Sequence, residues 1–229
     1  MPAPRRPPSG AAPNVRTIRE MDPFATAIDS VAELRALYED PIPAALRKDV
    51  GRLDEVCRRL IAASPMVLLG SVDADGRGDV SPRGGPPGFV QVLDEAHLAI
   101  PDATGNRRLD TLANVVASGR LGLLFLIPGR DTTLRVSGRA CVSADAELIA
   151  RLEPVGKPPR SAIVVAAEEV FAHCPKAFIR SRLWDPASWL DPDTLPSPAE
   201  VTHAHLADET LTVADIAASQ RESVLHHLA

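Results

Sequence analysis

The residues best suited to chemistry lie in an arginine-containing segment, Pro101–Leu112. An apolar stretch ends at Pro101, a Gly-Asn turn follows, and a helical pattern then begins. Asn106 is a good helix N-cap, so we expect Arg107 and Arg108 in the first helical turn. Each cation there is unfavourable by about 0.3–1 kcal/mol unless an anion joins it. Helix amides beside guanidinium groups favour a phosphate site, and two exposed arginines without a ligand are the alternative.

A second segment, Asp79–Phe89, is rich in glycine and proline. These residues favour an irregular backbone that a flat ligand can approach closely. Taken alone, the segment is equally typical of a plain surface loop. It gains weight only together with the other segments.

The third segment, His173–Trp184, follows an apolar stretch and begins a predicted helix with Pro175 at or near its first position. Lys176 and Arg180 lie one helical turn apart, and like charges on one face are mildly destabilising without an anion. The histidine and cysteine that open the segment are adjacent, so they point to opposite sides of a strand. Because no second pair has the spacing of zinc ligands, we predict no metal site.

The elements that must position these segments are mainly short strands. Glycine and proline turns separate the apolar stretches, a pattern that favours an antiparallel barrel over a βαβ repeat. The predicted strands are Met66–Val72, Val90–Leu93, His97–Ile100, Leu121–Ile127, Leu134–Val142 and Ala162–Val170.

Helices are predicted around these strands. Ser30 and Glu33 form a capping-box pattern at the start of the first helix. We expect three parts: a disordered proline-rich tail over residues 1–20, a main domain with N-terminal helices over 21–190, and a linker with a helical arm over 191–229. The predicted helices are Ser30–Tyr38, Ala45–Ala63, Arg107–Ser118, Lys176–Trp184 and Val213–Leu228.

Composition excludes several classes of function. The chain of 229 residues has a formal net charge of −5, a pI of about 5.7 and only 3% aromatic residues, so we expect no nucleic-acid partner. No apolar run approaches the roughly 20 residues of a membrane-spanning helix, and no secretory signal is recognisable. Three widely spaced cysteines argue against a disulfide framework. We therefore predict a cytoplasmic protein without a membrane partner.

Taken in order, the motifs resemble one family, the flavoproteins related to pyridoxamine 5′-phosphate oxidase. The resemblance extends roughly from Ser30 to Leu190 and implies the FMN-binding split barrel, a mainly antiparallel β-barrel with flanking helices (α+β). The motifs that carry it are Ser81–Gly85, Ala99–Asp102, Gly105–Asn114, Gly122–Gly129, Thr133–Ala140 and His173–Trp184.

The resemblance implies a homodimer with FMN bound at the subunit interface. The turn of Asn106, Arg107 and Arg108 would hold the FMN phosphate. Ser81, Pro82 and Arg83 would lie along the isoalloxazine ring, and Thr133 and Arg135 would line the flavin from the long alternating strand. Lys176, Ser181 and Trp184 would reach the flavin or the substrate, from the same subunit or from the partner subunit.

The function that the resemblance implies is flavin-mediated hydride or electron transfer to or from a small molecule. The alternatives are a flavin-binding or sensing protein without turnover and a deazaflavin-dependent reductase; some relatives bind haem. The arginine and histidine motif with which pyridoxamine phosphate oxidases bind substrate is missing from the C-terminal part. We therefore assign no substrate, and no catalytic acid or base is recognisable.

Overall fold

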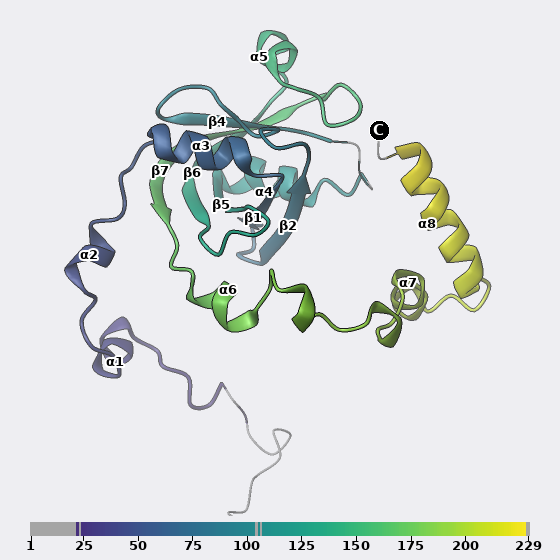
Figure 1. The fold of residues 1–229 in the computed structure, drawn as a ribbon, viewed down its shortest axis with the longest axis horizontal. Helices are drawn as coiled ribbons and strands as arrows, with labels where there is room; N and C mark the ends of the chain where they lie inside the picture. Colours follow the sequence, from purple (N-terminus) through teal and green to yellow (C-terminus); the bar gives the residue numbers. More distant parts are fainter. Residues whose placement is uncertain (1–21, 23, 104, 106, 228–229) are drawn as a thin grey trace, which may run out of the picture. The chain divides into compact units, whose positions relative to one another are not determined.

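The computed structural model describes residues 22, 24–103, 105 and 107–227 (Figure 1). The chain divides into two compact units, Met1–Leu46 and Arg47–Ala229. Asn106 and the predicted tail over residues 1–20 lie outside the described residues.

The first unit contains two short helices, α1 (Val31–Ala36) and α2 (Pro43–Leu46). The predicted cap is confirmed, because the Ser30 hydroxyl accepts a hydrogen bond from the backbone N–H of Glu33 at 3.2 Å. Proline at positions 41 and 43 separates the two helices.

The predicted helix over Ala45–Ala63 is wrong in its first half. Helix α3 begins only at Glu55 and ends at Ala63, and Gly51 in the preceding stretch is left-handed, with φ of 58°. The Asp54 carboxylate caps α3 by accepting a hydrogen bond from the N–H of Cys57 at 2.9 Å. The apolar periodicity runs through this break and hides it.

The second unit is built on one seven-stranded antiparallel sheet in the order β2-β1-β5-β6-β7-β4-β3. The sheet curls into a half-barrel, which confirms the predicted fold class (Figure 1). Its strands are β1 (Met66–Val72), β2 (Gly78–Gly84), β3 (Gln91–Val92), β4 (His97–Pro101), β5 (Arg120–Leu126), β6 (Leu134–Ser143) and β7 (Ala162–Ala172).

Strand β2 corrects the expectation of an irregular backbone in the glycine- and proline-rich segment. It pairs with β1 from Val72↔Gly78 to Met66↔Gly84 across a short turn. Pro82 is compatible with this pairing because β2 is the outermost strand of the sheet and one side of its backbone needs no partner there.

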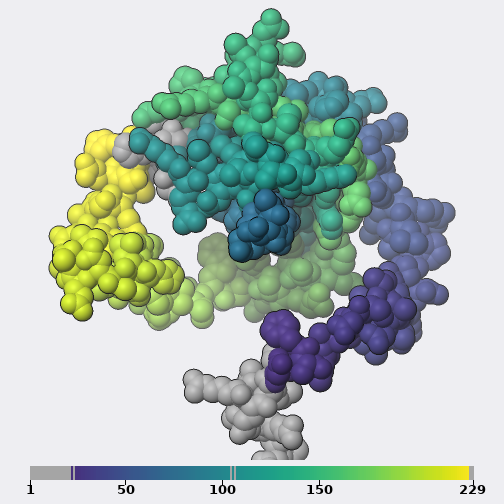
Figure 2. All heavy atoms as spheres, turned by 180° about the vertical axis from the view of Figure 1, so that it is seen from behind, coloured from purple at the N-terminus to yellow at the C-terminus, as the bar shows by residue number. Residues whose placement is uncertain are grey.

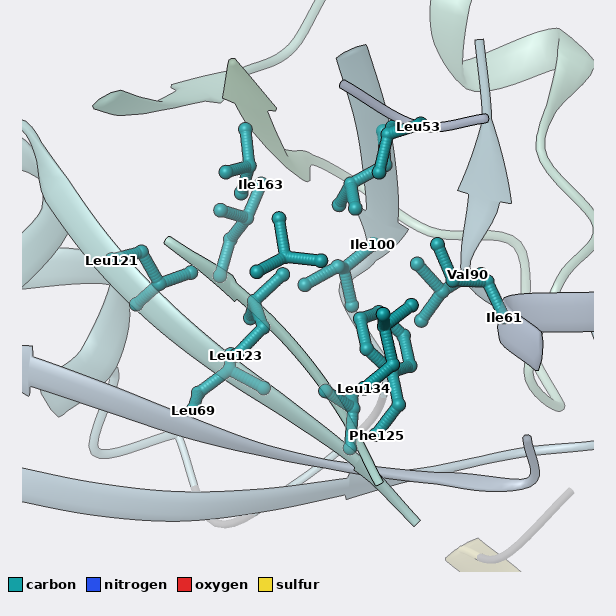
Figure 3. Packing of buried hydrophobic residues seen from close by; sticks show 14 of the residues in the cluster. Leu53, Ile61, Leu69, Val90, Ile100, Leu121, Leu123, Phe125, Leu134 and Ile163 are labelled. Atoms are coloured by element: carbon teal, nitrogen blue, oxygen red, sulfur yellow. The ribbon is translucent and has the colours of Figure 1, made fainter. Parts of the chain in front are cut away.

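The core lies on the inner face of the curl. Strands β1 and β5 alternate between buried and less buried residues, although their sequences are apolar almost throughout. Figure 3 shows side chains from β1, β4, β5, β6, β7 and α3 converging there. Among its most buried members are Leu53, Ile61, Val67, Leu69, Leu98, Ile100, Leu123, Phe125 and Val136.

A β-bulge bends β6 next to β7. The pairing register shifts between Ser137 and Gly138, and a Cβ built on Gly138 would lie 1.9 Å from the carbonyl oxygen of Ala166. No side chain fits at that distance, so glycine is required. Bulges increase local twist, which contributes to the curl of the sheet.

Helix α4 (Asp110–Ser118) packs against β1, β2 and β6, with Thr111, Asn114 and Val115 buried (Figure 1). Helix α5 (Ala146–Arg151) stands out from the space-filled body in Figure 2. It is anchored by a small cluster in which Leu152 packs with residues of β4 and β7.

Helix α6 (Lys176–Ser181) follows β7, as predicted. The predicted C-terminal helix is α8 (Val213–His227), but α7 (Pro198–Leu206) was not predicted. Helices α7 and α8 contact each other, and Gln220 donates a hydrogen bond to Thr202 at 3.1 Å. Within the described residues, each helix is too short or too polar to cross a membrane.

Candidate functional site

A cleft of about 1260 Å³ lies where β4 ends and β7 begins. These strands are antiparallel neighbours and Pro101 of β4 pairs with Ala162 of β7. The N–H of Asp102 donates a hydrogen bond to the carbonyl oxygen of Ser161 at 2.9 Å. The β4–α4 loop and the α5–β7 loop therefore lie side by side, and both border the cleft.

Curling brings strand β2 to the same cleft. In strand order β2 and β4 lie near opposite ends of the sheet, yet Ser81, Pro82 and Arg83 border the cleft together with Asp102. Alternation places Ser81 and Arg83 on the inner face, opposite the buried Leu69 and Val67 of β1. Pro82 belongs to the outer face.

A buried polar network connects β2 to α4. The Asp79 carboxylate accepts hydrogen bonds from the hydroxyls of Ser71 and Thr111, each at 3.2 Å. The side-chain amide of Asn114 donates to the Ser71 hydroxyl at 3.0 Å. Asp79 also borders the cleft. Because partners from three elements satisfy one another, the network holds this wall of the cleft in place.

The predicted start of the helix at Arg107 is wrong. Helix α4 begins at Asp110, because Arg107 and Leu109 adopt the left-handed conformation with φ of 64° and 61°. Both arginines therefore lie in the loop before the helix, and both border the cleft. Arg108 donates a hydrogen bond from Nε to the Asp110 carboxylate at 2.7 Å.

This correction changes the electrostatic argument. An acidic residue, Asp110, now occupies the first turn of α4, where it complements the helix dipole. The arginines are held by a strained loop, since left-handed residues other than glycine are uncommon and gather at ligand-binding sites. Both arginines of the predicted phosphate site are present at the cleft. They are not in the first turn of the helix, so the helix-dipole argument for a phosphate does not apply to them.

Asp102 is a cleft residue that sequence reasoning missed. Burial raises the pKa of its carboxyl above the ordinary value of 3.8, while the nearby charge of Arg83 opposes that increase. Arg83 itself donates hydrogen bonds to the Ser81 hydroxyl at 2.5 Å and to the Pro82 carbonyl oxygen at 3.1 Å. Asp102 thus lies at one wall of the cleft, within the electrostatic influence of Arg83.

Lys157 and Arg160 were also missed. Both border the cleft from the α5–β7 loop, on either side of two consecutive prolines. The sequence does show two cations on either side of two prolines, a pattern compatible with an anion site on a loop. Their place at this cleft depends on the pairing of β4 with β7, which local patterns do not reveal.

The other predicted cofactor-binding residues do not border this cleft. Together they lie near the start of β6, the end of β7 and α6, and we call them the α6 cluster: Thr133, Arg135, Lys176, Ser181 and Trp184. The backbone N–H of His173 donates to the Thr133 carbonyl oxygen at 2.8 Å. The indole of Trp184 donates to the Arg130 carbonyl oxygen at 2.9 Å and stacks on Phe178.

The cleft and the α6 cluster lie at opposite ends of β7. The strand has 11 residues, beginning beside the cleft and ending beside the cluster. At about 3.3 Å per residue, the two ends of β7 are about 30 Å apart, although Arg135 is level with Pro82 across the sheet through β5 and β1. Among the described residues of the predicted site, one chain brings Ser81, Pro82, Arg83, Arg107 and Arg108 to the cleft.

The cleft favours an anionic ligand. Its described lining has five cationic side chains (Arg83, Arg107, Arg108, Lys157, Arg160) and three carboxylates (Asp79, Asp102, Asp110). The Asp79 carboxylate is occupied by its two hydroxyl donors, and Asp110 pairs with Arg108. Among the described residues, no group of three or more histidine, cysteine or acidic side chains is arranged to hold a metal ion.

The curled antiparallel sheet with flanking helices places the chain in the class of split-barrel proteins. The family model of pyridoxamine 5′-phosphate oxidase matches residues 53–174, more than half of the chain. The chain therefore belongs to the pyridoxamine 5′-phosphate oxidase family. The match includes the cleft and ends before α6.

Solved structures with a similar fold cover about half of the chain. A candidate pyridoxamine 5′-phosphate oxidase from Lactobacillus delbrueckii has 27% identity and a TM-score of 0.42, over 54% of this chain and 98% of that one. An FMN-binding protein from Syntrophomonas wolfei has 15% identity and a TM-score of 0.38, over 51% and 83%. The haem storage protein HutZ from Vibrio cholerae has 13% identity and a TM-score of 0.36, over 53% and 94%. No curated protein matches the sequence.

Proposed function

We propose that the protein binds FMN in the cleft and is an FMN-dependent oxidoreductase acting on a small molecule. The observation that carries the proposal is the meeting of Ser81 and Arg83 on β2 with Arg107 and Arg108 of the β4–α4 loop, in a chain of this family. The comparisons alone give the family and the fold.

The residues present fit the cofactor. Arg107 and Arg108 supply guanidinium groups for a phosphate. Among the described strands β2 pairs with β1 alone, so its outer backbone edge has hydrogen-bonding groups for the polar edge of a ring. The cleft of about 1260 Å³ also exceeds the roughly 300–1,000 Å³ of common ligand pockets, which leaves room for a second molecule.

FMN, when bound, would supply the acceptance and release of a hydride or of electrons. The chain would bind and orient it. The positive charge of Arg83 would stabilise negative charge that develops near β2. The Asp102 carboxyl, with its raised pKa, would hold a proton at the cleft wall more readily than an exposed carboxyl does.

A homodimer with flavin at the interface accounts for the α6 cluster. None of its residues borders the cleft of their own chain. In the proposed homodimer, the cluster of a second copy would reach the ligand instead. Exposed apolar side chains beside the cleft, Val80 and Leu109 among them, are 73% and 56% exposed and would be covered in such an assembly.

A cytoplasmic location fits this function. All three cysteines (Cys57, Cys141, Cys174) are free thiols in the structure. A reducing compartment keeps thiols in that state.

The test is to purify the protein without added cofactor, record its visible spectrum and identify any released chromophore by mass. Arg107→Ala with Arg108→Ala should reduce FMN occupancy at least about tenfold, because two charge-assisted contacts are lost. The matched control is Arg47→Ala with Lys48→Ala, which removes two neighbouring exposed cations outside the cleft.

Two outcomes would contradict the proposal: a colourless wild type that does not bind added FMN, and a double variant that keeps FMN at wild-type occupancy. Release of a deazaflavin or haem would assign a different cofactor. Reduction of bound FMN by a nicotinamide cofactor, followed by reoxidation with a trial acceptor, would separate an enzyme from a flavin-binding protein without turnover.

A further inference from the structure

Three of the five described cations of the cleft have no ion pair: Arg107, and the two cations of the α5–β7 loop, Lys157 and Arg160. Lys157 and Arg160 are exposed at the cleft, and within the described part of the chain no carboxylate lies within ion-pair distance of either. By contrast, Arg108 pairs with Asp110, and Arg83 is hydrogen bonded to β2 and faces Asp102. Two uncompensated like charges at one cleft favour an anion between them.

The loop that carries these cations is held in place. Lys157 and Arg160 flank Pro158 and Pro159, whose rings fix φ, and Pro159 is buried. Before the prolines, Leu152 packs into the small cluster with β4 and β7. After them, the Asp102–Ser161 backbone hydrogen bond ties the loop to β4. The backbone that presents the two side chains is thus ordered before any ligand arrives, which lowers the entropic cost of binding.

This pair is separate in the chain from the arginines proposed for FMN. Arg107 and Arg108 come from the loop that leaves β4, whereas Lys157 and Arg160 come from the loop that enters β7. FMN carries one phosphate, for which one pair of cations suffices. The cleft also has volume beyond a common single-ligand pocket.

We propose that Lys157 and Arg160 form a second anion subsite in the cleft. It binds a phosphate or carboxylate carried by the second molecule, the small-molecule electron donor or acceptor, and not by FMN. The inference rests on the proposed function for the identity of the first ligand. It deepens that function by assigning the substrate to the class of anionic small molecules.

The probe is inorganic pyrophosphate, titrated by calorimetry at low ionic strength into the full-length protein loaded with FMN. The wild type should bind one pyrophosphate per chain. Lys157→Gln with Arg160→Gln should weaken that binding by about tenfold or more, and change FMN affinity by less than about twofold. Arg47→Gln with Lys48→Gln removes the same charge elsewhere and should leave both affinities unchanged.

Two results would overturn the subsite. If the Lys157/Arg160 double variant binds pyrophosphate as the wild type does, the pair has no anion role. If it instead loses FMN about as strongly as the Arg107/Arg108 double variant, the pair belongs to the cofactor's phosphate. Riboflavin, which lacks that phosphate, tests this second result. If the pair binds the cofactor's phosphate, the Lys157/Arg160 double variant should bind riboflavin as tightly as the wild type does.

The failure of the proposed function gives a different pattern. A wild type that binds no FMN but binds pyrophosphate in a manner dependent on Lys157 and Arg160 would refute the cofactor and retain the anion subsite. A wild type that binds neither FMN nor pyrophosphate would refute both proposals.

Discussion

The cleft and the α6 cluster differ in how the fold builds them. The cleft is assembled within one chain from three segments far apart in sequence, and the Asp79 network holds one of its walls. The α6 cluster comes largely from neighbouring residues and is stabilised by exposed contacts, such as the hydrogen bond from Trp184 to Arg130. One region is a formed cleft, and the other is an exposed surface to which our proposal assigns a ligand-binding role in a homodimer.

This difference indicates that a single chain completes the part of the predicted site at the cleft, but not the part at the α6 cluster. Cations and an edge strand suffice for a phosphate and a planar ring, and the cleft supplies both. In the proposed homodimer, the residues of the α6 cluster would reach the same ligand from a second copy. The comparison can be tested at both regions.

The largest expected effect is complementation between the two regions. Arg107→Ala with Arg108→Ala, and separately Lys176→Ala with Trp184→Ala, should each abolish FMN retention in a homodimer. Unfolding the two variant proteins, mixing them and refolding them should restore FMN to about one quarter of the sites, because half of random dimers are mixed and each has one intact site. Released FMN measures the occupancy.

The comparison fails if mixing restores no flavin while co-purification of two differently tagged variants shows that mixed dimers have formed. In that case the α6 cluster does not share the ligand of the partner's cleft. A mixture of the two cleft variants Arg107→Ala and Arg108→Ala, prepared in the same way, serves as the control and should gain less.

A smaller effect should separate the two regions by stability. Asn114→Ala removes a buried amide that donates to Ser71, so we expect a loss of about 1–3 kcal/mol in the free energy of unfolding. Ser181→Ala removes an exposed hydroxyl bonded to the Phe178 carbonyl oxygen and should cost less than about 0.5 kcal/mol. Urea denaturation measures both, and equal losses would refute the distinction.

The smallest expected effect concerns the pH dependence of stability at the cleft. Burial raises the pKa of Asp102 in the folded state, so folding favours its protonated form, and stability decreases as the pH rises from 3.8 through the folded value. Asp102→Asn removes this decrease. Relative to wild type, its Tm should rise between pH 3.5 and pH 7 by no more than about 2 °C.

The control for this prediction is Asp193→Asn, an exposed aspartate outside the cleft. That variant removes the same negative charge away from the cleft, so it measures the effect of the charge change alone. If Asp102→Asn behaves in the same way, burial at the cleft wall does not influence the carboxyl.

The strands were predictable where alternation and burial agree. Strands β5 and β6 carry apolar residues at every second position, and burial follows that pattern. Strand β2 was missed because its glycine and proline residues do not favour a strand locally. Its extended conformation comes from pairing with β1. The start of α4 was missed because two left-handed residues, Arg107 and Leu109, delay it.

The candidate site was predictable in part for the same reason. Arg107, Arg108 and Arg83 stand out in local motifs, and the structure brings them to one cleft. Lys157 and Arg160 lie in no recognised motif. Only the pairing of Pro101 with Ala162 places their loop beside the β4–α4 loop, and long-range pairing leaves no local signature.

Strand β2 has one further consequence, because it is held to the sheet by β1 alone among the described strands. An outer strand with one row of partners opens more easily than a central strand. A ligand that contacts β2, the β4–α4 loop and the α5–β7 loop would hold β2 to the opposite end of the sheet. Because binding stabilises the closed state, it would slow amide exchange in β2 more than in β5 or β6. Amide exchange in β2 would therefore report whether the cleft is occupied.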